Sequence, residues 1–446
     1  KFLPVSAMSL IRFPGLACFL LLPGSGPPTT LICGSIESGE CSNEHGIPGQ
    51  CLSSGGKASF PAPKDLLKWR VEIYTGKPPI NKIYGGPHVA EAFGKWFEGP
   101  VDDDHWHLLW TYRSQAGALQ SMSLPPQKGG RLVNHCGYFK AAGQKCILAE
   151  HISSVANSMQ KLAANISTLG FLQSFRVRYE GEFKKWMHAV KAEPDRYWIA
   201  KPCTGGAAKG IQILKGTEVL ATGGREWLGE ETVLQELVER PYLGFGGRKF
   251  HLRLYILITR WWPSVGAFLF DEGFVFRSRH TYLHDKPSVN TDVFSRIADD
   301  VEGLLLSQLW DSLDSESDSK LPANASGIVR QRITALLRMT LSTNLRETFG
   351  DAEHLEHRGF RCFDLFGADV MINEDLQPLL LEMNMSPNIW IDDHGEQVLP
   401  LLHSIKGPLV AQISHWSALQ CSMEPRSVSE AVAIEDSALV NFTRIH

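Results

Sequence analysis

Two polar side chains interrupt an apolar stretch near the end of the chain, LLLEMNMSPN at residues 379–388. Glu382 and Asn384 are two positions apart, so both point to one face if this segment is a β-strand. A carboxylate and an amide on one face supply oxygen atoms, which are the ligands that Mg²⁺ prefers in proteins. The alternative is a solvated face at the edge of a sheet.

The segment before it adds a second carboxylate. FGADVMI at residues 366–372 is followed by Asn-Glu-Asp, which is typical of turns. A hairpin centred between residues 375 and 376 places Asp369 directly opposite Glu382, where two carboxylates repel each other unless a cation lies between them. We therefore predict a magnesium site formed by Asp369, Glu382 and Asn384. A register shift of one residue would remove it, and a solvated pair on an exposed sheet is the alternative.

A second cluster lies in RKFHLRLYILIT at residues 248–259. Lys249, His251 and Arg253 alternate with apolar residues, so a strand here presents all three to one face. Three potential cations in a row repel each other unless they meet anions such as phosphates or a substrate carboxylate. The alternative is the solvated basic face of an edge strand.

A glycine-rich loop follows a short strand in WIAKPCTGGAAKGIQIL at residues 198–214. Small residues let a backbone fold over phosphates, and nearby lysines can neutralise them. The pattern is neither a Walker A loop nor a dinucleotide-binding fingerprint, and by itself it is weak evidence because many loops look like this. The residues that we expect at the phosphates are Lys201, Gly205, Gly206, Lys209 and Gly210.

The composition is that of a folded protein, and it sets limits on partners. The 446 residues are 43% hydrophobic and carry a formal net charge of −4, which gives no general attraction to nucleic acid. Nine cysteines occur without a CxxC pair, and we expect the five after residue 51 to be reduced thiols. Residues 1–65 are predicted to be a disordered or targeting leader, since 8–26 weakly resembles a signal or transit peptide.

Hydrophobic spacing places the supporting elements. Helices are predicted at 145–162, around 183–190, at 327–345 and near 397–415, and strands at 197–202, 232–238, 248–259, 361–372 and 378–384. Residues 283–325 are polar and read as an irregular insertion. Strands and helices alternate along the chain. Some consecutive strands are instead joined directly by a tight turn, and this favours an α+β fold with a largely antiparallel sheet.

The order of these motifs resembles the tubulin tyrosine ligase-like family of the ATP-grasp superfamily. The resemblance spans about residues 70–415 and is carried by FLQSFR, YWIAKP, VLQELVERPYLGFGGRKFHLRLYILIT, CFDLFGADVMI and LLLEMNMSPN, with RLVNHCGYF similar to an N-terminal family segment. It implies an ATP-grasp fold with a smaller α/β N-terminal domain. The expected parts are an N-terminal domain at 66–170, a central subdomain at 171–240, a C-terminal subdomain at 241–416 with the insertion 283–325, and a tail at 417–446.

The resemblance also implies roles for individual residues. The expected ATP contacts are Lys201, Gly205, Gly206, Lys209 and Gly210 at the phosphates, Gln235, Glu236, Leu237 and Val238 at the adenine, and Lys249 and Asn290 on the phosphate side. Lys249, Arg253 and Arg277 would bind the triphosphate, the acceptor or the amino acid, and Asp369, Glu382 and Asn384 would bind Mg²⁺.

The function implied by the resemblance is ATP-dependent ligation of tyrosine, glutamate or glycine to a protein carboxylate, with tubulin or microtubules as partner. We expect a cytoplasmic or cytoskeletal monomer that binds neither nucleic acid nor membrane, with organelle targeting or secretion left open by residues 8–26. Departures from the family pattern leave alternatives, because His251 stands where the family usually has Asp, and the glycine loop has fewer spaced glycines. These alternatives are a non-catalytic tubulin- or protein-binding module and a ligase acting on a small molecule.

Overall fold

The computed structural model describes residues 8–13, 16–21, 31–35, 67–70, 84–101, 104–112, 119, 123–124, 130–135, 144–160, 169–205, 209–223, 228–229, 231–244, 247–261, 265–283, 287, 301–315, 321–342, 350–391, 398–423 and 428–446. The chain divides into two units, Lys1–Lys57 and Ala58–His446. In the first unit, the strands β1 (Met8–Phe13), β2 (Leu16–Leu21) and β3 (Leu31–Ser35) form an antiparallel sheet. The assignment of residues 1–65 as a leader stays a prediction.

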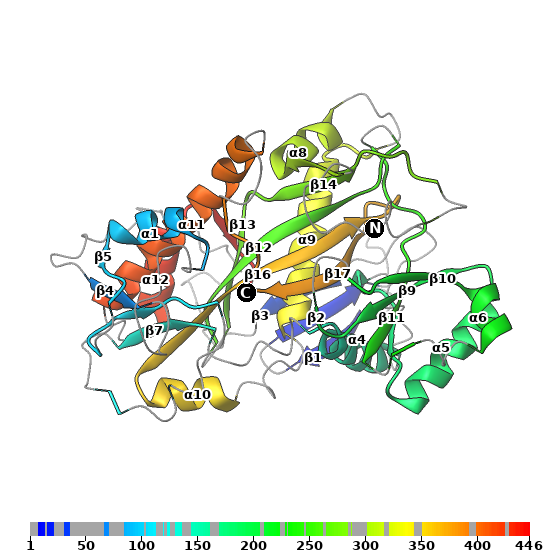
Figure 1. The fold of residues 1–446 in the computed structure, drawn as a ribbon, viewed down its shortest axis with the longest axis horizontal. Coiled ribbons are helices and arrows are strands. Elements are labelled where there is room, and N and C mark those ends of the chain that lie inside the picture. Colours follow the sequence, from blue (N-terminus) through cyan, green and yellow to red (C-terminus); the bar gives the residue numbers. More distant parts are fainter. Residues whose placement is uncertain are drawn as a thin grey trace, which may run out of the picture. The chain divides into compact units, whose positions relative to one another are not determined.

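The second unit is organised around a large mixed sheet (Figure 1). Its strand order is β15 (Val301–Leu305), β14 (Phe274–Ser278), β12 (Phe250–Arg260), β16 (Phe360–Ile372), β7 (Arg131–Asn134), β6 (Leu108–Leu109), β4 (Leu67–Arg70) and β5 (Phe97–Glu98). Three further strands join it, because β17 (Pro378–Met385) pairs with β16, β13 (Gly266–Phe270) pairs with β12, and β18 (Phe442–Arg444) pairs with β13. Pairing is antiparallel from β15 to β16 and parallel from β16 to β5. This arrangement confirms the α+β class.

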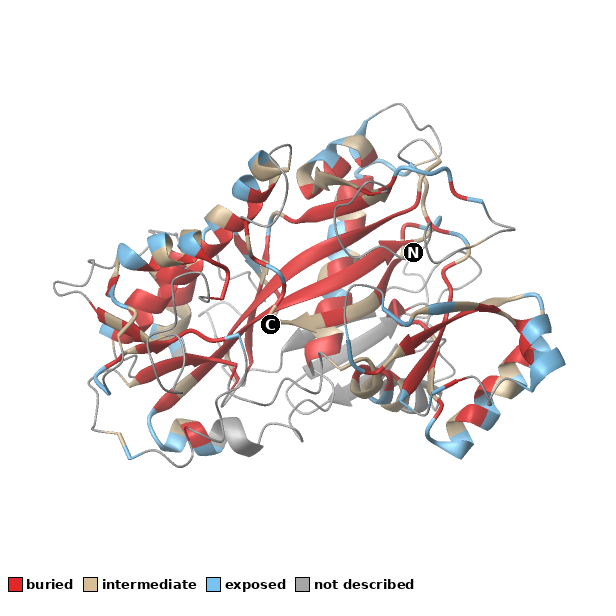
Figure 2. Cartoon of the chain, viewed as in Figure 1, coloured by how far each residue is buried: buried red, intermediate tan, exposed pale blue. Residues whose placement is uncertain are grey.

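The two longest strands form the buried centre of this sheet (Figure 2). Strand β12 is buried at every position except its last, and β16 is buried at every position except its second. A strand covered on both faces normally reads as a continuous apolar run. The buried polar residues His251, Arg253 and Asp369 break that run, so each needs a partner to offset the loss of its hydration.

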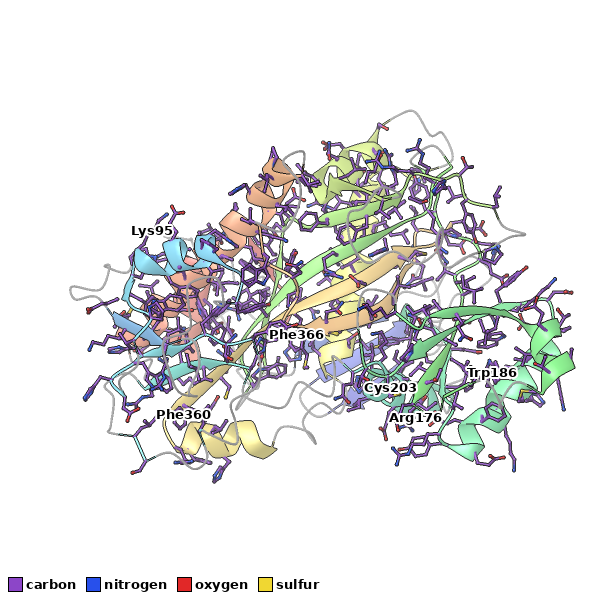
Figure 3. The ribbon with its side chains drawn as sticks, viewed as in Figure 1. Lys95, Arg176, Trp186, Cys203, Phe360 and Phe366 are labelled. Carbon is purple, nitrogen blue, oxygen red and sulfur yellow. A yellow bond between two sulfur atoms is a disulfide. The ribbon has the colours of Figure 1, made fainter. Side chains whose placement is uncertain are left out.

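A separate four-stranded antiparallel sheet carries the glycine loop. Its order is β10 (Gln212–Lys215), β9 (Tyr197–Pro202), β11 (Thr232–Glu236) and β8 (Ser174–Arg176). Helix α5 (Glu180–Ala192) covers one face, and α6 (Gly216–Thr222) follows β10. The helix predicted here is confirmed, and Phe183, Trp186 and Val190 pack against this sheet. Trp186 is labelled in Figure 3. Burying side chains of this size contributes about 1.5–3 kcal/mol each.

The remaining described helices are α1 (Pro87–Gly94), α4 (Lys145–Gln160), α8 (Leu306–Asp314), α9 (Ala325–Ser342), α10 (Gly350–His357), α11 (Leu399–Ser422) and α12 (Val428–Ala438). Among the helices of the described residues, none combines the length and the apolar character needed to cross a bilayer. The predicted tail at 417–446 contributes the end of α11, helix α12 and strand β18 to the second unit.

Two sequence predictions are corrected by the fold. The stretch 283–325 is not irregular throughout, because it contains β15 and α8, whose residues Leu306, Leu309, Trp310 and Leu313 are buried at helical spacing. The polar run that follows them obscured this pattern. The expectation of reduced thiols is wrong for Cys146 and Cys203, which form a disulfide with each other, and for Cys362, which is also disulfide-bonded. Cys146 and Cys203 are 57 residues apart in the sequence, so only the tertiary fold brings them together.

A buried network of hydrogen bonds connects the ends of β7 and β17 to β16, close to Asn384. Asp364 on β16 accepts hydrogen bonds from the backbone N–H of His135 (3.1 Å), and its Oδ1 lies 2.9 Å from His135 Nδ1. Its other oxygen accepts from Trp261 Nε1 at 3.1 Å. On the far side of the ring, His135 Nε2 lies 2.9 Å from the hydroxyl of Ser386, two residues after Asn384. The network therefore joins β7, β16 and the end of β17.

We expect Asp364→Asn to lower the free energy of unfolding by about 2–4 kcal/mol, because one amide oxygen cannot replace two buried carboxylate oxygens and the amide nitrogen faces a donor. Urea unfolding measures the change. Asp436→Asn is the matched control, since Asp436 pairs with Arg444 at 2.8 Å on the surface and its loss should cost less than about 1 kcal/mol. Equal losses in the two variants would contradict this account.

Candidate active site

The hairpin of β16 and β17 places the predicted metal ligands together. Asp369 lies directly opposite Glu382, as the sequence predicts. The register nevertheless differs nearer the turn, where Val370 pairs with Leu380 and Ile372 with Pro378. An irregularity after Asp369 adds one residue to β17 and brings the two carboxylates opposite each other. The predicted pairing of Asp369 with Glu382 is thus confirmed. The turn alone does not produce it, because the register changes by one residue between the turn and Asp369.

Asn384 links the two carboxylates. Its Nδ2 donates to Asp369 Oδ2 at 3.2 Å and to Glu382 Oε1 at 3.3 Å. One point in space is therefore within reach of both acidic side chains. Rotation of the Asn384 amide by half a turn would present its oxygen to the same point in place of its nitrogen. Three hard oxygen ligands can thus converge here, and this donor set fits Mg²⁺.

Arg253 is the counter-ion of Asp369. The two residues are paired across β12 and β16, and Arg253 donates from Nε to Oδ1 at 2.5 Å and from Nη2 to Oδ2 at 3.0 Å. Burial alone would raise the pKa of Asp369, but the guanidinium outweighs it and holds that pKa below its usual value. Asp369 is therefore ionised, as a metal ligand must be.

Lys145 is a site residue that the sequence analysis missed. Its ammonium lies 3.4 Å from Glu382 Oε2 and donates to the carbonyl of Gly205 at 3.0 Å. It therefore connects the start of α4, the metal-ligand strand and the glycine loop. A lysine at the start of a predicted amphipathic helix is an ordinary feature, so its spacing in the sequence carried no signal.

Lys201 lies at the end of β9, buried among polar groups. Its ammonium donates to Gln235 Oε1 at 2.7 Å and to the carbonyl of Leu381 at 3.3 Å. Burial lowers its pKa to about 8, with Lys145 acting in the same direction and the nearby carboxylates Glu382 and Asp369 in the opposite one. A bound phosphate would favour the charged form.

The pKa of Lys201 predicts a pH dependence of nucleotide binding. Below pH 8 the ammonium is already charged, whereas above pH 8 binding an anion requires the uptake of a proton. If this group contacts the phosphates, the KM for ATP should rise above pH 8, by up to about tenfold per pH unit. Steady-state kinetics at pH 7, 8 and 9 measures it.

Lys201→Arg is the matched control, because a guanidinium does not titrate in this range. We expect its KM for ATP to change less between pH 7 and 9 than that of the wild type. A wild-type KM that is constant over this interval would exclude Lys201 from the phosphate contacts.

The basic strand carries fewer charges than its sequence suggests. Burial lowers the pKa of His251 to about 4, and the neighbouring Arg253 and Lys249 act in the same direction, so this imidazole is neutral at pH 7. Its ring packs against Phe276, with centroids 5.2 Å apart. Lys249 is also buried, and its ammonium lies 5.1 Å from the centre of the Tyr282 ring. Two cations, rather than three, therefore share this face.

Other predicted contacts lie farther from this cluster. Arg277 on β14 lies directly opposite Phe250 on β12, so its side chain is on the face of Phe250 and not on the face of His251 and Arg253. Its guanidinium forms an ion pair with Glu302. The structure does not bring Arg277 to the face that carries Arg253. Lys209 is exposed. Gly206 and Asn290 lie outside the described residues, so their roles stay predictions.

The ends of the glycine loop need glycine for their backbone conformation. Gly205 has φ +103° and Gly210 has φ +72°, values that side chains rarely adopt. A Cβ at Gly210 would also approach Pro202 to 3.0 Å. These two glycines are therefore required by the shape of the loop.

The segment predicted to meet adenine consists of the last two residues of β11 and the two residues that follow it. Gln235, Glu236, Leu237 and Val238 are all buried. The backbone N–H groups of Glu236 and Leu237 already donate to Gln173 at 3.0 Å and Tyr197 at 3.1 Å. The Glu236 side chain accepts from Arg196 Nη2 at 2.5 Å. Its carboxylate is therefore part of the structure of this segment.

The chain is similar to proteins of one known family. The profile of the Tubulin-tyrosine ligase family matches residues 134–405. Among the relatives, the probable tubulin polyglutamylase ttll-9 of Caenorhabditis elegans is 25% identical over 309 residues, which cover 66% of this chain and 70% of the relative. The probable alpha-tubulin polyglutamylase Ttll1 of Tetrahymena thermophila is 23% identical over 329 residues, which cover 66% of this chain and 75% of the relative. The human tubulin monoglutamylase TTLL4 is 22% identical over 370 residues, covering 78% of this chain but 27% of the relative.

Proposed function

Because the chain belongs to the tubulin-tyrosine ligase family, we propose that it is an ATP-dependent ligase that attaches glutamate to a carboxylate of tubulin. The observation that carries the proposal is the cluster of Asp369, Glu382 and Asn384, with Lys145 beside Glu382. Glutamate is chosen over tyrosine and glycine because the relatives named above are glutamylases. The proposed place of action is the cytoskeleton.

The donor set of two carboxylates and one amide fits Mg²⁺, which would supply positive charge for the nucleotide phosphates. Asp369, Glu382 and the flipped amide of Asn384 would hold the metal, which would neutralise the charge that develops on the transferred phosphoryl group. Arg253 keeps Asp369 ionised and fixes its position by two hydrogen bonds. Lys145 would exchange its contact with Glu382 for one with a phosphate.

The reaction itself needs little from the protein beyond positioning and charge. An acceptor carboxylate attacks the γ-phosphorus of ATP, and ADP leaves with the electrons of the broken P–O bond. The amine of the incoming glutamate then attacks the acyl carbon, phosphate leaves, and the nitrogen loses a proton. Lys201, Lys145 and Lys249 would hold anionic groups through these steps. The hydrogen bonds of Lys201 to Gln235 and of Lys145 to Gly205, and the burial of Lys201 and Lys249, support this role.

The remaining contacts are part of the same proposal. Gln235, Glu236, Leu237 and Val238 would line the adenine pocket, and Gly205, Gly206, Lys209 and Gly210 would cover the phosphates. Arg277 and Asn290 are proposed for the amino acid and the phosphate side, and the ion pair of Arg277 with Glu302 would have to open for that role.

A non-catalytic binding module is the second candidate, and the observation that favours it is the buried, neutral His251 on the basic strand. The ionised pair of Asp369 and Arg253 favours the enzyme. A third reading, a ligase with a small-molecule acceptor, uses the same residues and differs only in the acceptor.

The test is ATP-dependent incorporation of radiolabelled glutamate, tyrosine and glycine into purified tubulin, in three parallel reactions. We expect incorporation of glutamate that requires both ATP and Mg²⁺. Incorporation of tyrosine or glycine instead would revise the amino acid and keep the ligase. MgATP binding without any incorporation into tubulin would favour another acceptor, and the absence of nucleotide binding would favour the module.

A further inference from the structure

The disulfide between Cys146 and Cys203 lies between two lysines of the proposed nucleotide site. Cys146 directly follows Lys145 at the start of α4, and Cys203 follows β9, which carries Lys201. Their Cα atoms are 5.0 Å apart, within the usual range for a disulfide. The bond therefore ties the first turn of α4 to the end of the strand that delivers Lys201.

The two sulfur atoms differ in access to solvent. Cys203 is 5% exposed and packs with Ala149 and Val233, whereas Cys146 is only half-buried. Cys146 also lies in the first turn of the 16-residue helix α4. Cys146 is therefore the sulfur that an external reagent would meet first, and Cys203 is placed to react with it second.

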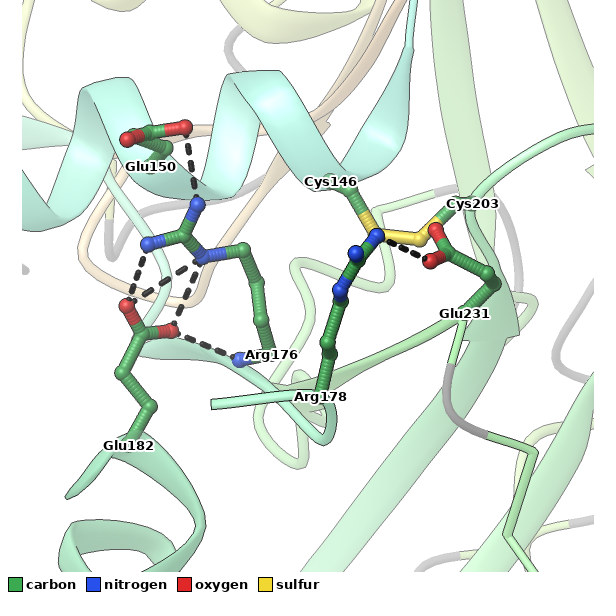
Figure 4. The surroundings of a disulfide bond; sticks show 7 residues. All are labelled: Cys146, Glu150, Arg176, Arg178, Glu182, Cys203 and Glu231. Carbon is green, nitrogen blue, oxygen red and sulfur yellow. Dashed lines mark hydrogen bonds and ion pairs between the residues drawn. A yellow bond between two sulfur atoms is a disulfide. The ribbon is translucent and has the colours of Figure 1, made fainter. Parts of the chain in front are cut away.

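Charged side chains surround the pair (Figure 4). The carboxylate of Glu231 lies within 4.8 Å of the two sulfurs, and it accepts a hydrogen bond from Arg178 at 2.8 Å. Both of these side chains are exposed. The guanidinium thus offsets the repulsion that Glu231 would exert on a neighbouring thiolate.

We infer that Cys146 and Cys203 form a thiol–disulfide exchange site for small disulfides of the oxidised-glutathione class, and that closing the bond strengthens nucleotide binding by fixing Lys145. The second part rests on the function proposed above. The link from the bond to the site is short, because Lys145 contacts both Glu382 and the carbonyl of Gly205, two residues after Cys203.

The exchange balances in two steps. The thiolate of Cys146 attacks one sulfur of the external disulfide, whose S–S bond breaks, and the first small thiolate leaves and takes up a proton. The thiolate of Cys203 then attacks the Cys146 sulfur of the mixed disulfide, and the second small thiol leaves. Two protein thiols are oxidised and one external disulfide is reduced to two thiols.

The reduced protein, in which Cys146 and Cys203 are not bonded, lacks one restraint on the position of Lys145. Without the bond, the start of α4 and the end of β9 are held by noncovalent contacts, including those of Ala149 and Val233. Positioning Lys145 then costs conformational freedom when the nucleotide binds, and we expect the Kd for MgATP to rise roughly three- to tenfold on reduction. The melting temperature should fall by about 5 °C or more, since the bond closes a long loop.

The experiment compares the full chain equilibrated with oxidised or reduced glutathione. Mass spectrometry of peptides measures the Cys146–Cys203 link, and calorimetry with MgATP measures the Kd. Cys146→Ser and Cys203→Ser should show the weaker binding in both buffers. Cys421→Ser is the matched control, because Cys421 is a buried free thiol whose contact with the carbonyl of His107 a serine can keep. This variant should retain the wild-type response.

Several results would overturn the inference. The linked peptide could fail to form in oxidised glutathione, or it could form without changing the Kd for MgATP by more than about twofold. Retention of Zn²⁺ by the reduced protein, with protection of both thiols from alkylation, would make the pair a metal site instead. A chain that forms the link but binds no nucleotide in either buffer would overturn the proposed function and its nucleotide-dependent part, while keeping the exchange site.

Discussion

Glu382→Gln should abolish ATP turnover while leaving the protein folded. The substitution keeps the shape of the side chain and removes the charge that the proposed metal would need. We expect turnover of MgATP to fall by at least about a hundredfold, as for the loss of other groups that stabilise charge in a transition state. Stability should change by less than about 1 kcal/mol, because the lost contact with Lys145 is offset by relief of the repulsion from Asp369. ADP release and urea unfolding measure the two quantities.

Glu374→Gln provides the control for this variant. Glu374 lies in the turn of the same hairpin and forms an exposed ion pair with Arg240. Its substitution removes the same charge without touching the site, so turnover should stay at the wild-type level. Wild-type turnover by Glu382→Gln would remove this carboxylate from the metal site.

Arg253→Lys should lower turnover by roughly ten- to a hundredfold, although it keeps the charge. The fork of Arg253 holds both oxygens of Asp369, whereas an ammonium is a single point that cannot reproduce two parallel bonds. A charge-assisted hydrogen bond is worth about 1.5–3 kcal/mol, and this range corresponds to the expected loss if the bond acts in the transition state. Steady-state kinetics of ADP release measures it.

Arg253→Ala should lower turnover more than Arg253→Lys does. It should also lower the free energy of unfolding by about 3–5 kcal/mol, because Asp369 would stay buried without its counter-ion. Arg260→Lys is the control. Arg260 lies on β12, as Arg253 does, and its guanidinium forms an ion pair of 3.1 Å with the buried Glu435 of α12. This control variant should lower stability and leave the KM for ATP unchanged. Equal losses of turnover in Arg253→Lys and Arg260→Lys would reduce Arg253 to a structural residue.

The structure also changes the interpretation of Arg253. The alternation of Lys249, His251 and Arg253 suggested a face of three cations aimed at phosphates. Burial makes His251 neutral, and the guanidinium of Arg253 is bound to Asp369. Alternation in a strand shows which residues share a face, but it does not show how deeply they are buried or what the neighbouring strand brings to them.

The sequence predicted best where local patterns decide the structure. Helix α5 follows from the spacing of Phe183, Trp186 and Val190, and the hairpin of two apolar strands follows from their sequence pattern, although an irregularity after Asp369 is what brings that residue opposite Glu382. It predicted less where tertiary contacts decide. Lys145 and the pair of Cys146 and Cys203 are brought to the site by the packing of α4 against the four-stranded sheet and β17, which no local pattern records.

The central claim, that this chain activates a carboxylate with ATP, is tested most directly by following oxygen. A tubulin-tail peptide with ¹⁸O in its carboxylates is incubated with the protein, MgATP and glutamate, and the released phosphate is analysed by mass spectrometry. An acylphosphate requires one acceptor oxygen to leave with the phosphoryl group, so we expect one ¹⁸O in the phosphate for each amide bond formed. Amide formation with unlabelled phosphate would contradict the account.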